Sequence, residues 1–134
     1  MTMHRILQPV GWQRPSGYSN GIVAKGSTIS LAGQIGWDAM TGRIAEGMAA
    51  QVEQALSNIV TLLAEAGAQA TDVVRMTWFV TDMEQYRLEA KAIGQGYRRV
   101  MGRHFPTMSV IGVSCLVERE ALVEIEATAV TSHA

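Results

Sequence analysis

Residues 48–66 read MAAQVEQALSNIVTLLAEA, and their apolar side chains recur every three or four positions. This spacing is typical of a helix that buries one face. The apolar set is Met48, Val52, Leu56, Ile59, Leu63 and Ala66, and the polar set on the other face is Gln51, Glu53, Gln54, Ser57 and Thr61. Gly67 follows, and glycine tolerates the left-handed backbone that often ends a helix. The sequence therefore predicts an amphipathic helix over residues 48–66.

The segment after this helix predicts a strand and then a second helix. Residues 73–81, VVRMTWFVT, are rich in the β-branched and aromatic side chains that favour strands. Residues 81–84, TDME, match a capping box in which Thr81 and Glu84 satisfy exposed backbone N–H groups. Apolar residues at helical spacing then predict a helix to about residue 101.

The remaining strands are expected on either side of this central part. Residues 21–34, GIVAKGSTISLAGQ, favour a hairpin of two strands, and residues 37–47 favour a loop. Pro106 ends the second helix and opens a strand-like run over residues 107–116. Residues 122–130, LVEIEATAV, alternate as expected for a strand with one buried face.

These elements predict one α+β domain over residues 1–134, in the order β-β-α-β-α-β-β. The chain has 134 residues, of which 48% are hydrophobic, and that size suits a single core. Residues 1–19 carry turn formers and no period, so that residues 1–15 are expected to form an irregular N-terminal arm. Both helices are expected on one face of the sheet.

The other face of the sheet is expected to contact a second copy of the chain. Trp78 opposes Phe79 along one strand and Val110 opposes Ile111 along another, so neither side is plainly polar. A sheet with apolar groups on both faces needs a second covering layer, which two helices cannot provide. The sequence therefore predicts a homo-oligomer with closed cyclic symmetry.

Charge and composition exclude several classes of protein. A net charge of -1 gives no strong field to attract nucleic acid or an anionic membrane. Cys115 is the one cysteine, and the three histidines lack metal-ligand spacing. No stretch approaches the roughly 20 apolar residues that cross a bilayer. We expect a cytoplasmic protein with no metal site and no nucleic-acid or membrane partner.

Few side chains are available for chemistry. Glu124 and Glu126 share one side of the last strand, where they could serve as acid and base or form a solvated strand face. Tyr18 could line a ligand cleft or cover the edge of the core. Cys115 is expected to be a small buried hydrophobe rather than a nucleophile. A basic cluster, Arg98, Arg99, Arg103 and His104, is expected to complement the helix dipole rather than bind an anion.

Several segments, in this order and spacing, resemble the RidA/YjgF/YER-type family of small trimeric proteins, many of them enamine/imine deaminases. They are YSNG (18–21), LAGQI (31–35), TG (41–42), QVEQALSNIVTLL (51–63), AG (66–67), DVVRMTWFVTD (72–82), FP (105–106) and VEIEATAV (123–130). The resemblance implies a chorismate-mutase-like fold, a homotrimer whose sheets form a central barrel, and ligand clefts between neighbouring subunits.

The resemblance also implies an activity and site residues. Deaminases of the family hydrolyse reactive 2-imino or unsaturated 2-amino acids to 2-keto acids and ammonia without a cofactor. Their water-positioning, proton-moving glutamate matches Glu124, and a tyrosine and a glycine match Tyr18 and Gly33. At three further substrate-binding positions the chain departs from the family: Met108 stands in place of the carboxylate-binding arginine, Val110 in place of a common cysteine, and Ala90 in place of an asparagine.

The loss of the arginine leaves two hypotheses open. A guanidinium–carboxylate contact contributes about 1.5–3 kcal/mol, and a thioether cannot replace it. Arg14, Arg75 or Arg103 could reach in instead. The chain is then a deaminase with altered substrate preference, or a non-catalytic trimer that binds a small metabolite as a sensor or scavenger. Neutral charge and the lack of histidine pairs argue against a ribonuclease.

Overall fold

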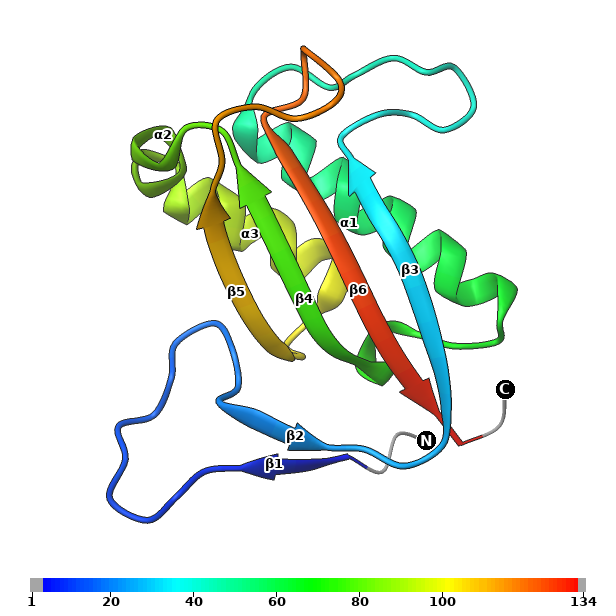
Figure 1. The fold of residues 1–134 in the computed structure, drawn as a ribbon, viewed down its shortest axis with the longest axis vertical. Coiled ribbons are helices and arrows are strands. Elements are labelled where there is room, and N and C mark those ends of the chain that lie inside the picture. The colour runs from blue at the N-terminus through cyan, green and yellow to red at the C-terminus, as the bar shows by residue number, and fades with distance from the viewer. Residues whose placement is uncertain (1–3, 133–134) are drawn as a thin grey trace.

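A four-stranded sheet with helices on one face forms the body of the molecule (Figure 1). The computed structural model describes residues 4–132. The sheet order is β3 (Ser27–Ile35), β6 (Val123–Thr131), β4 (Val73–Val80) and β5 (Thr107–Gly112). Helices α1 (Met48–Glu65) and α3 (Ala90–Met101) lie side by side behind it. The predicted α+β class, with both long helices on one face, is confirmed.

Strand direction follows from the connections. β6 pairs antiparallel with both β3 and β4, whereas β4 and β5 are parallel. A parallel pair needs a long crossover, and here the helical segment between β4 and β5 provides it. The helix predicted over residues 48–66 is confirmed as α1, and Gly67 follows it with a φ of 70°.

The core lies between the sheet and the two long helices. Alternate residues of β6 face the helices, and their register partners on β4 share that face. The fully buried side chains of this layer are Met76, Trp78, Val80, Val123, Ile125, Val52, Leu56, Ile59 and Leu63. This agrees with the apolar faces read from the sequence for α1, β4 and β6.

The N-terminal part of the chain differs from the prediction. β1 (Arg5–Leu7) pairs antiparallel with β2 (Gly21–Val23), so the first 19 residues are not wholly irregular. The hairpin predicted over residues 21–34 is wrong, because β3 pairs with β6 and not with β2. Gly26, with a φ of 143°, crosses so close to the Thr131 backbone that a Cβ would lie 2.3 Å from its carbonyl oxygen. The segment is therefore a junction between two sheets.

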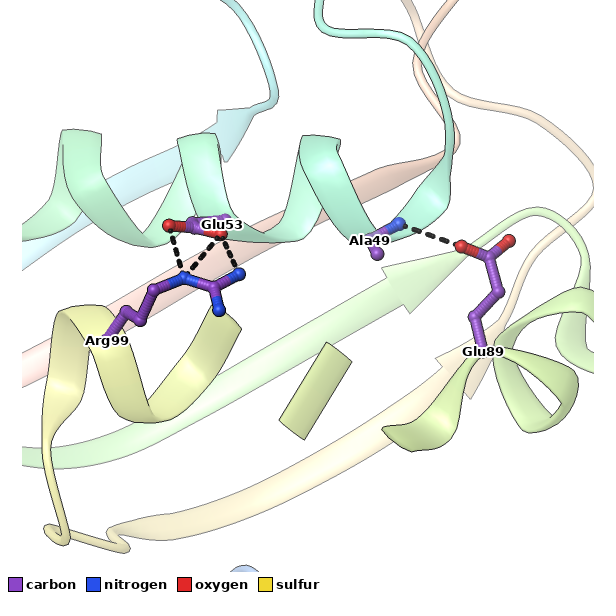
Figure 2. A network of polar contacts seen from close by, with 4 residues as sticks. All are labelled: Ala49, Glu53, Glu89 and Arg99. Atoms are coloured by element: carbon purple, nitrogen blue, oxygen red, sulfur yellow. Dashed lines mark hydrogen bonds and ion pairs between the residues drawn. The ribbon is translucent and has the colours of Figure 1, made fainter. Parts of the chain in front are cut away.

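The second predicted helix is divided into two helices. α2 (Met83–Leu88) begins after Asp82, whose carboxylate accepts a hydrogen bond from the Gln85 backbone at 3.0 Å, so Thr81 is not the cap. Glu89 separates α2 from α3, and its carboxylate accepts a hydrogen bond from the Ala49 backbone N–H at 3.2 Å (Figure 2). A carboxylate at this first turn of α1 satisfies a donor that the helix itself leaves free.

The open face of the sheet is more polar than the sequence indicated. The register places Glu124 beside Phe79 and Glu126 beside Thr77 on this face, while Met108 and Val110 lie on the helix side. Apolar groups on the open face gather at one end, where Phe79 pairs with Ile111. The prediction that Glu124 and Glu126 share one side of the last strand is confirmed, and apolar groups give the open face a mixed character at the Phe79 end.

Smaller elements complete the described chain. η1 (Ala70–Asp72) leads into β4, and β5 ends at Gly112, earlier than the residue 116 expected. Cys115 is exposed, so the expectation of a buried cysteine is wrong. The loop predicted over residues 37–47 is confirmed, and Asp38 accepts hydrogen bonds from two backbone N–H groups at its tip. Within residues 4–132, no helix is long and apolar enough to cross a membrane.

Candidate functional site

Glu124 and Gly33 lie against each other on the open face of the sheet. A β-bulge between Leu31 and Gln34 shifts the register of β3 against β6. A Cβ atom built on Gly33 would lie 2.2 Å from Oε2 of Glu124 and 2.7 Å from its Cδ. Only glycine leaves the half-buried carboxylate in this position. The structure thus brings two of the predicted site residues together.

The Glu124 carboxylate has no hydrogen-bond donor among residues 4–132. Phe79 and Ile35 are its register partners on the two neighbouring strands. Both carboxylate oxygens are therefore left for a ligand or water. Such a carboxylate can accept a proton from a bound nucleophile.

Glu126 lies two residues further along the same face, as the alternation of β6 predicts. It lines a shallow hollow of about 140 Å³ with Ser30, Arg75, Thr77 and Thr128. Most of the residues that line this hollow are polar, and Glu126 is exposed. The two glutamates thus share a face but have different surroundings.

Met108 and Ala90 line a second hollow, of about 410 Å³, on the helix side of β5. Trp78, Gly94 and Arg98 contribute to the same walls. Val110 also lies on this side of β5, where it packs against the core, but it does not line the hollow. The structure therefore brings Met108 and Ala90 together and leaves Val110 apart.

Tyr18 occupies a third place, in the loop between β1 and β2. Its side chain is 41% exposed and lines a hollow of about 250 Å³ with Arg14, Arg103 and His104. Ser19 fixes this loop to the start of β5, because its backbone N–H donates to the Pro106 carbonyl at 3.0 Å. The predicted site residues thus fall into three places in one chain, with Glu124 and Met108 on opposite faces of the sheet.

Aromatic residues form the inner wall of the Met108 hollow. Tyr86 meets Trp78 edge-on at 6.3 Å, and Tyr97 stacks on Phe105 at 5.6 Å. Burial raises the pKa of the Tyr86 phenol, and it raises that of Tyr97 further. Both phenols therefore stay neutral at physiological pH, and the Tyr97 hydroxyl donates a hydrogen bond to the His104 carbonyl.

Sequence reasoning missed Arg98 as a group of this hollow. Ala90, Gly94 and Arg98 follow at intervals of four residues, which places them on one side of α3. A Cβ on Gly94 would lie 3.6 Å from the Arg98 Nη1 atom, so the guanidinium extends back over the glycine. In the sequence, this side of the hollow could have been recognised from two small residues and an arginine that follow one another at helical spacing.

No group of three histidine, cysteine, aspartate or glutamate side chains that could hold a metal ion occurs in the part of the chain that the structure describes. Of the three arginines considered as replacements, Arg14 and Arg103 line the Tyr18 hollow and Arg75 lies on the open face. None of them lines the hollow that contains Met108.

Comparison with known proteins places the chain in a family. The family model described as Endoribonuclease L-PSP matches residues 12–131. The 2-iminobutanoate/2-iminopropanoate deaminase of Salmonella typhimurium is 33% identical over 108 residues, which cover 78% of this chain and 80% of that protein.

Comparison with solved structures gives the same family. A Rid-family protein of unknown function from Yersinia pestis, YyfB, superposes with a TM-score of 0.82 at 32% identity, covering 96% of this chain and 98% of that one. Escherichia coli TdcF with bound serine gives a TM-score of 0.70 at 30% identity, covering 96% and 99%. With nearly its whole length matched in sequence and fold, the chain belongs to the Endoribonuclease L-PSP family, which is the RidA/YjgF family of the sequence resemblance.

Proposed function

We propose that this protein is a cofactor-independent hydrolytic deaminase of reactive enamine and imine metabolites. The observation that carries the proposal is the Glu124 carboxylate, which lies over Gly33 and accepts no hydrogen bond from the described residues. The names of the Salmonella relative and of E. coli TdcF, a putative reactive intermediate deaminase, support the reaction class.

In the proposed reaction, Glu124 acts as general base and then as general acid. It takes a proton from water while the water oxygen bonds to the C=N carbon. The C=N π electrons pass to nitrogen, which takes this proton from Glu124 to give the carbinolamine. Glu124 then moves the proton of the carbinolamine hydroxyl to nitrogen, and the C–N bond breaks as the carbon–oxygen double bond forms and ammonia leaves. Imine and water thus give a carbonyl compound and ammonia, with no electron transfer to a cofactor.

The proposed site is assembled between subunits of a homotrimer. Glu124 and Met108 lie on opposite faces of one sheet, so a cleft that joins both positions needs a neighbouring copy. The exposed apolar end of the open face, at Ile111, supports contact with such a copy. Closed cyclic symmetry would repeat the cleft at every interface. We place this trimer in the cytoplasm.

Met108 is proposed to alter substrate preference. Its thioether accepts hydrogen bonds only weakly and carries no charge, so it cannot hold a carboxylate as arginine does. Val110 and Ala90, in place of polar residues of the family, make the surroundings of a substrate more apolar. Tyr18 and Gly33 keep the residue types that the family has.

The test is the release of ammonia from a panel of enamines and imines. The unstable imines are produced in the cuvette by an amino-acid oxidase with catalase, and the rate is compared with spontaneous hydrolysis. Glu124→Gln should lose at least about 100-fold in rate. Glu126→Gln, on the same strand and face, is the matched control and should remain active. Equal rates for the wild type and Glu124→Gln would reject the role of Glu124.

A second candidate function is binding without catalysis, which the methionine at position 108 favours. In that case the protein would be stabilised by a small metabolite, and its melting temperature would rise with ligand concentration. No member of the panel would be hydrolysed faster than in buffer. Stabilisation without turnover would establish the sensor or scavenger and exclude the deaminase.

A further inference from the structure

The Met108 hollow contains one charged group, and most of its other lining residues are aromatic or apolar, with Ser16 as a polar exception. Arg98 is the cation, and no aspartate or glutamate is among the described residues that line the hollow. Trp78, Tyr86 and Met108 provide apolar surface. A volume of about 410 Å³ is within the range of small-molecule sites. The chemistry suits a small anion that also carries an apolar part.

Arg98 differs from the arginines near it on the helical segment. Arg99 pairs with Glu53 at 2.7 Å across the α1–α3 contact, as Figure 2 shows, and Arg87 pairs with Glu84 on α2. Within residues 4–132, no carboxylate pairs with Arg98. Its guanidinium extends over Gly94, toward the Ala90 end of α3. The two small residues leave this end of the hollow open above the helix.

A second polar group of the hollow also lacks a partner. Trp78 is 1% exposed, and its indole Nε1–H has no acceptor among the described residues. Buried donors without acceptors are uncommon in folded proteins, and they often mark a place where a ligand or an ordered water belongs. The hollow is therefore lined by a residue with an unpartnered donor, Trp78, and by a cation that pairs with no described carboxylate, Arg98.

We infer that this hollow binds a small organic acid with an apolar side chain, and that Arg98 holds its carboxylate. One part of this inference rests on the proposed function: the bound acid is taken to be the 2-imino acid substrate of the deaminase. A guanidinium offers two parallel N–H donors to a carboxylate, and such a contact is shorter and stronger than a neutral hydrogen bond. Arg98 is thus a substrate-binding residue on α3.

The experiment measures the binding of stable 2-keto acids by isothermal titration calorimetry. The probes are pyruvate, 4-methyl-2-oxopentanoate and the neutral methyl ester of the latter. The larger acid should bind more tightly than pyruvate, because its side chain meets the apolar walls, and the ester should bind weakly. Arg98→Gln should weaken binding of the larger acid roughly tenfold to hundredfold, the loss expected for a charged hydrogen bond.

Two variants separate this role from a structural one. Arg99→Gln removes the neighbouring arginine on α3 and should leave the Kd unchanged. Arg98→Lys keeps the charge without the planar fork and should recover part of the affinity. Arg98 is exposed, so both Arg98 variants should keep the melting temperature of the wild type. Arg99→Gln removes the exposed pair with Glu53 and should lower the melting temperature only slightly. Equal Kd values for Arg98→Gln and Arg99→Gln, or an ester that binds as well as its acid, overturn the inference.

The outcomes for the two proposals are distinguishable. If no imine is hydrolysed but keto-acid binding depends on Arg98, the deaminase proposal fails and the acid-binding site stands. If Glu124→Gln abolishes turnover while Arg98→Gln leaves both KM and the keto-acid Kd unchanged, the deaminase stands and the role of Arg98 is refuted.

Discussion

The position of the Glu124 carboxylate depends on a glycine, Gly33, on the neighbouring strand. Gly33 lies within the bulge of β3, and the carboxylate of Glu124 fills the space that a Cβ would take. The atom that would be displaced first is at the end of a flexible side chain, so the strand itself need not move. The glycine therefore controls where the carboxylate lies more than whether the sheet forms.

Gly33→Ala is expected to reduce ammonia release at least about tenfold with little loss of stability, since a general base must stay within hydrogen-bond reach. Rates on the imine panel and thermal melts check this. Gly112→Ala is the control, because a Cβ there would meet only Met83, at an ordinary 3.7 Å. An undiminished rate in Gly33→Ala would show that the position of the carboxylate in the structure is not the one used in catalysis.

At the scale of elements, the polar residues of α1 do more than face solvent. Gln51 is 3% exposed. Its amide donates to the carbonyls of Ala45 and Glu120 at 3.1 Å each, and its oxygen accepts from the Leu122 backbone at 2.8 Å. The side chain thus joins the loop before α1 to the turn before β6. Assigning Gln51 to an exposed face was wrong for this reason.

Gln51→Leu should destabilise the fold by about 1–3 kcal/mol, because it removes a buried amide that hydrogen-bonds to three backbone groups. Chemical denaturation followed by circular dichroism gives the free energy of unfolding. Ser57→Leu, at an exposed position of the same helix, should change it little. A similar effect of both substitutions would mean that the Gln51 hydrogen bonds contribute no net stability.

The contact between α1 and α3 also has a pH dependence. The hydrogen bond from Arg99 is the largest cause of the lowered pKa of Glu53, its positive charge adds to this, and desolvation opposes both. A carboxylate whose pKa is lowered in the folded state contributes its full stabilisation of the fold at pH values above its unfolded-state pKa, here about 4.5. That contribution is lost as the pH falls through the folded-state value.

Glu53→Gln should therefore lower the urea midpoint slightly at pH 7 and leave it unchanged in acid, below the folded-state pKa. The effect is small because the pair is exposed and solvent screens it. Glu65→Gln, at an exposed position near the end of the same helix, controls for the change of charge. An equal difference at both pH values would assign the effect to something other than ionisation of Glu53.

At the scale of the whole molecule, we expect the open face of the sheet to form the contact between copies in the proposed trimer. Its apolar end includes Ile111, which is 45% exposed in the single chain. A trimer that uses this face should sediment at three times 14.5 kDa at micromolar concentration. Ile111→Asp should shift it toward the monomer, since a charge buried without a partner is costly.

Leu88→Asp is the matched control for the assembly. Leu88 is 79% exposed on α2, away from the open face, and its substitution should leave the trimer intact. Monomeric wild-type protein at micromolar concentration would contradict the proposed assembly. It would also remove the reason for a cleft between copies.

The sequence by itself determined the helix over residues 48–66, the strands over 73–81 and 122–130, and the family. Regular alternation of apolar and polar groups is a local property, so it predicts which face of an element is buried. The motifs of the family resemblance also indicated Glu124 and Gly33 as candidate site residues. Local patterns cannot give strand pairing, which depends on contacts between distant segments, and the predicted 21–34 hairpin was wrong for that reason.

Only the tertiary structure decided which chemical groups share a place. It separated Glu124 from Met108 by the thickness of the sheet, and it brought Arg98 into the hollow that Met108 lines. It also showed that Gln51 is buried between two connecting segments. These outcomes depend on the packing of α1 and α3 against the sheet, and side-chain directions across such a packed layer are set by neighbours that the chain meets only after folding.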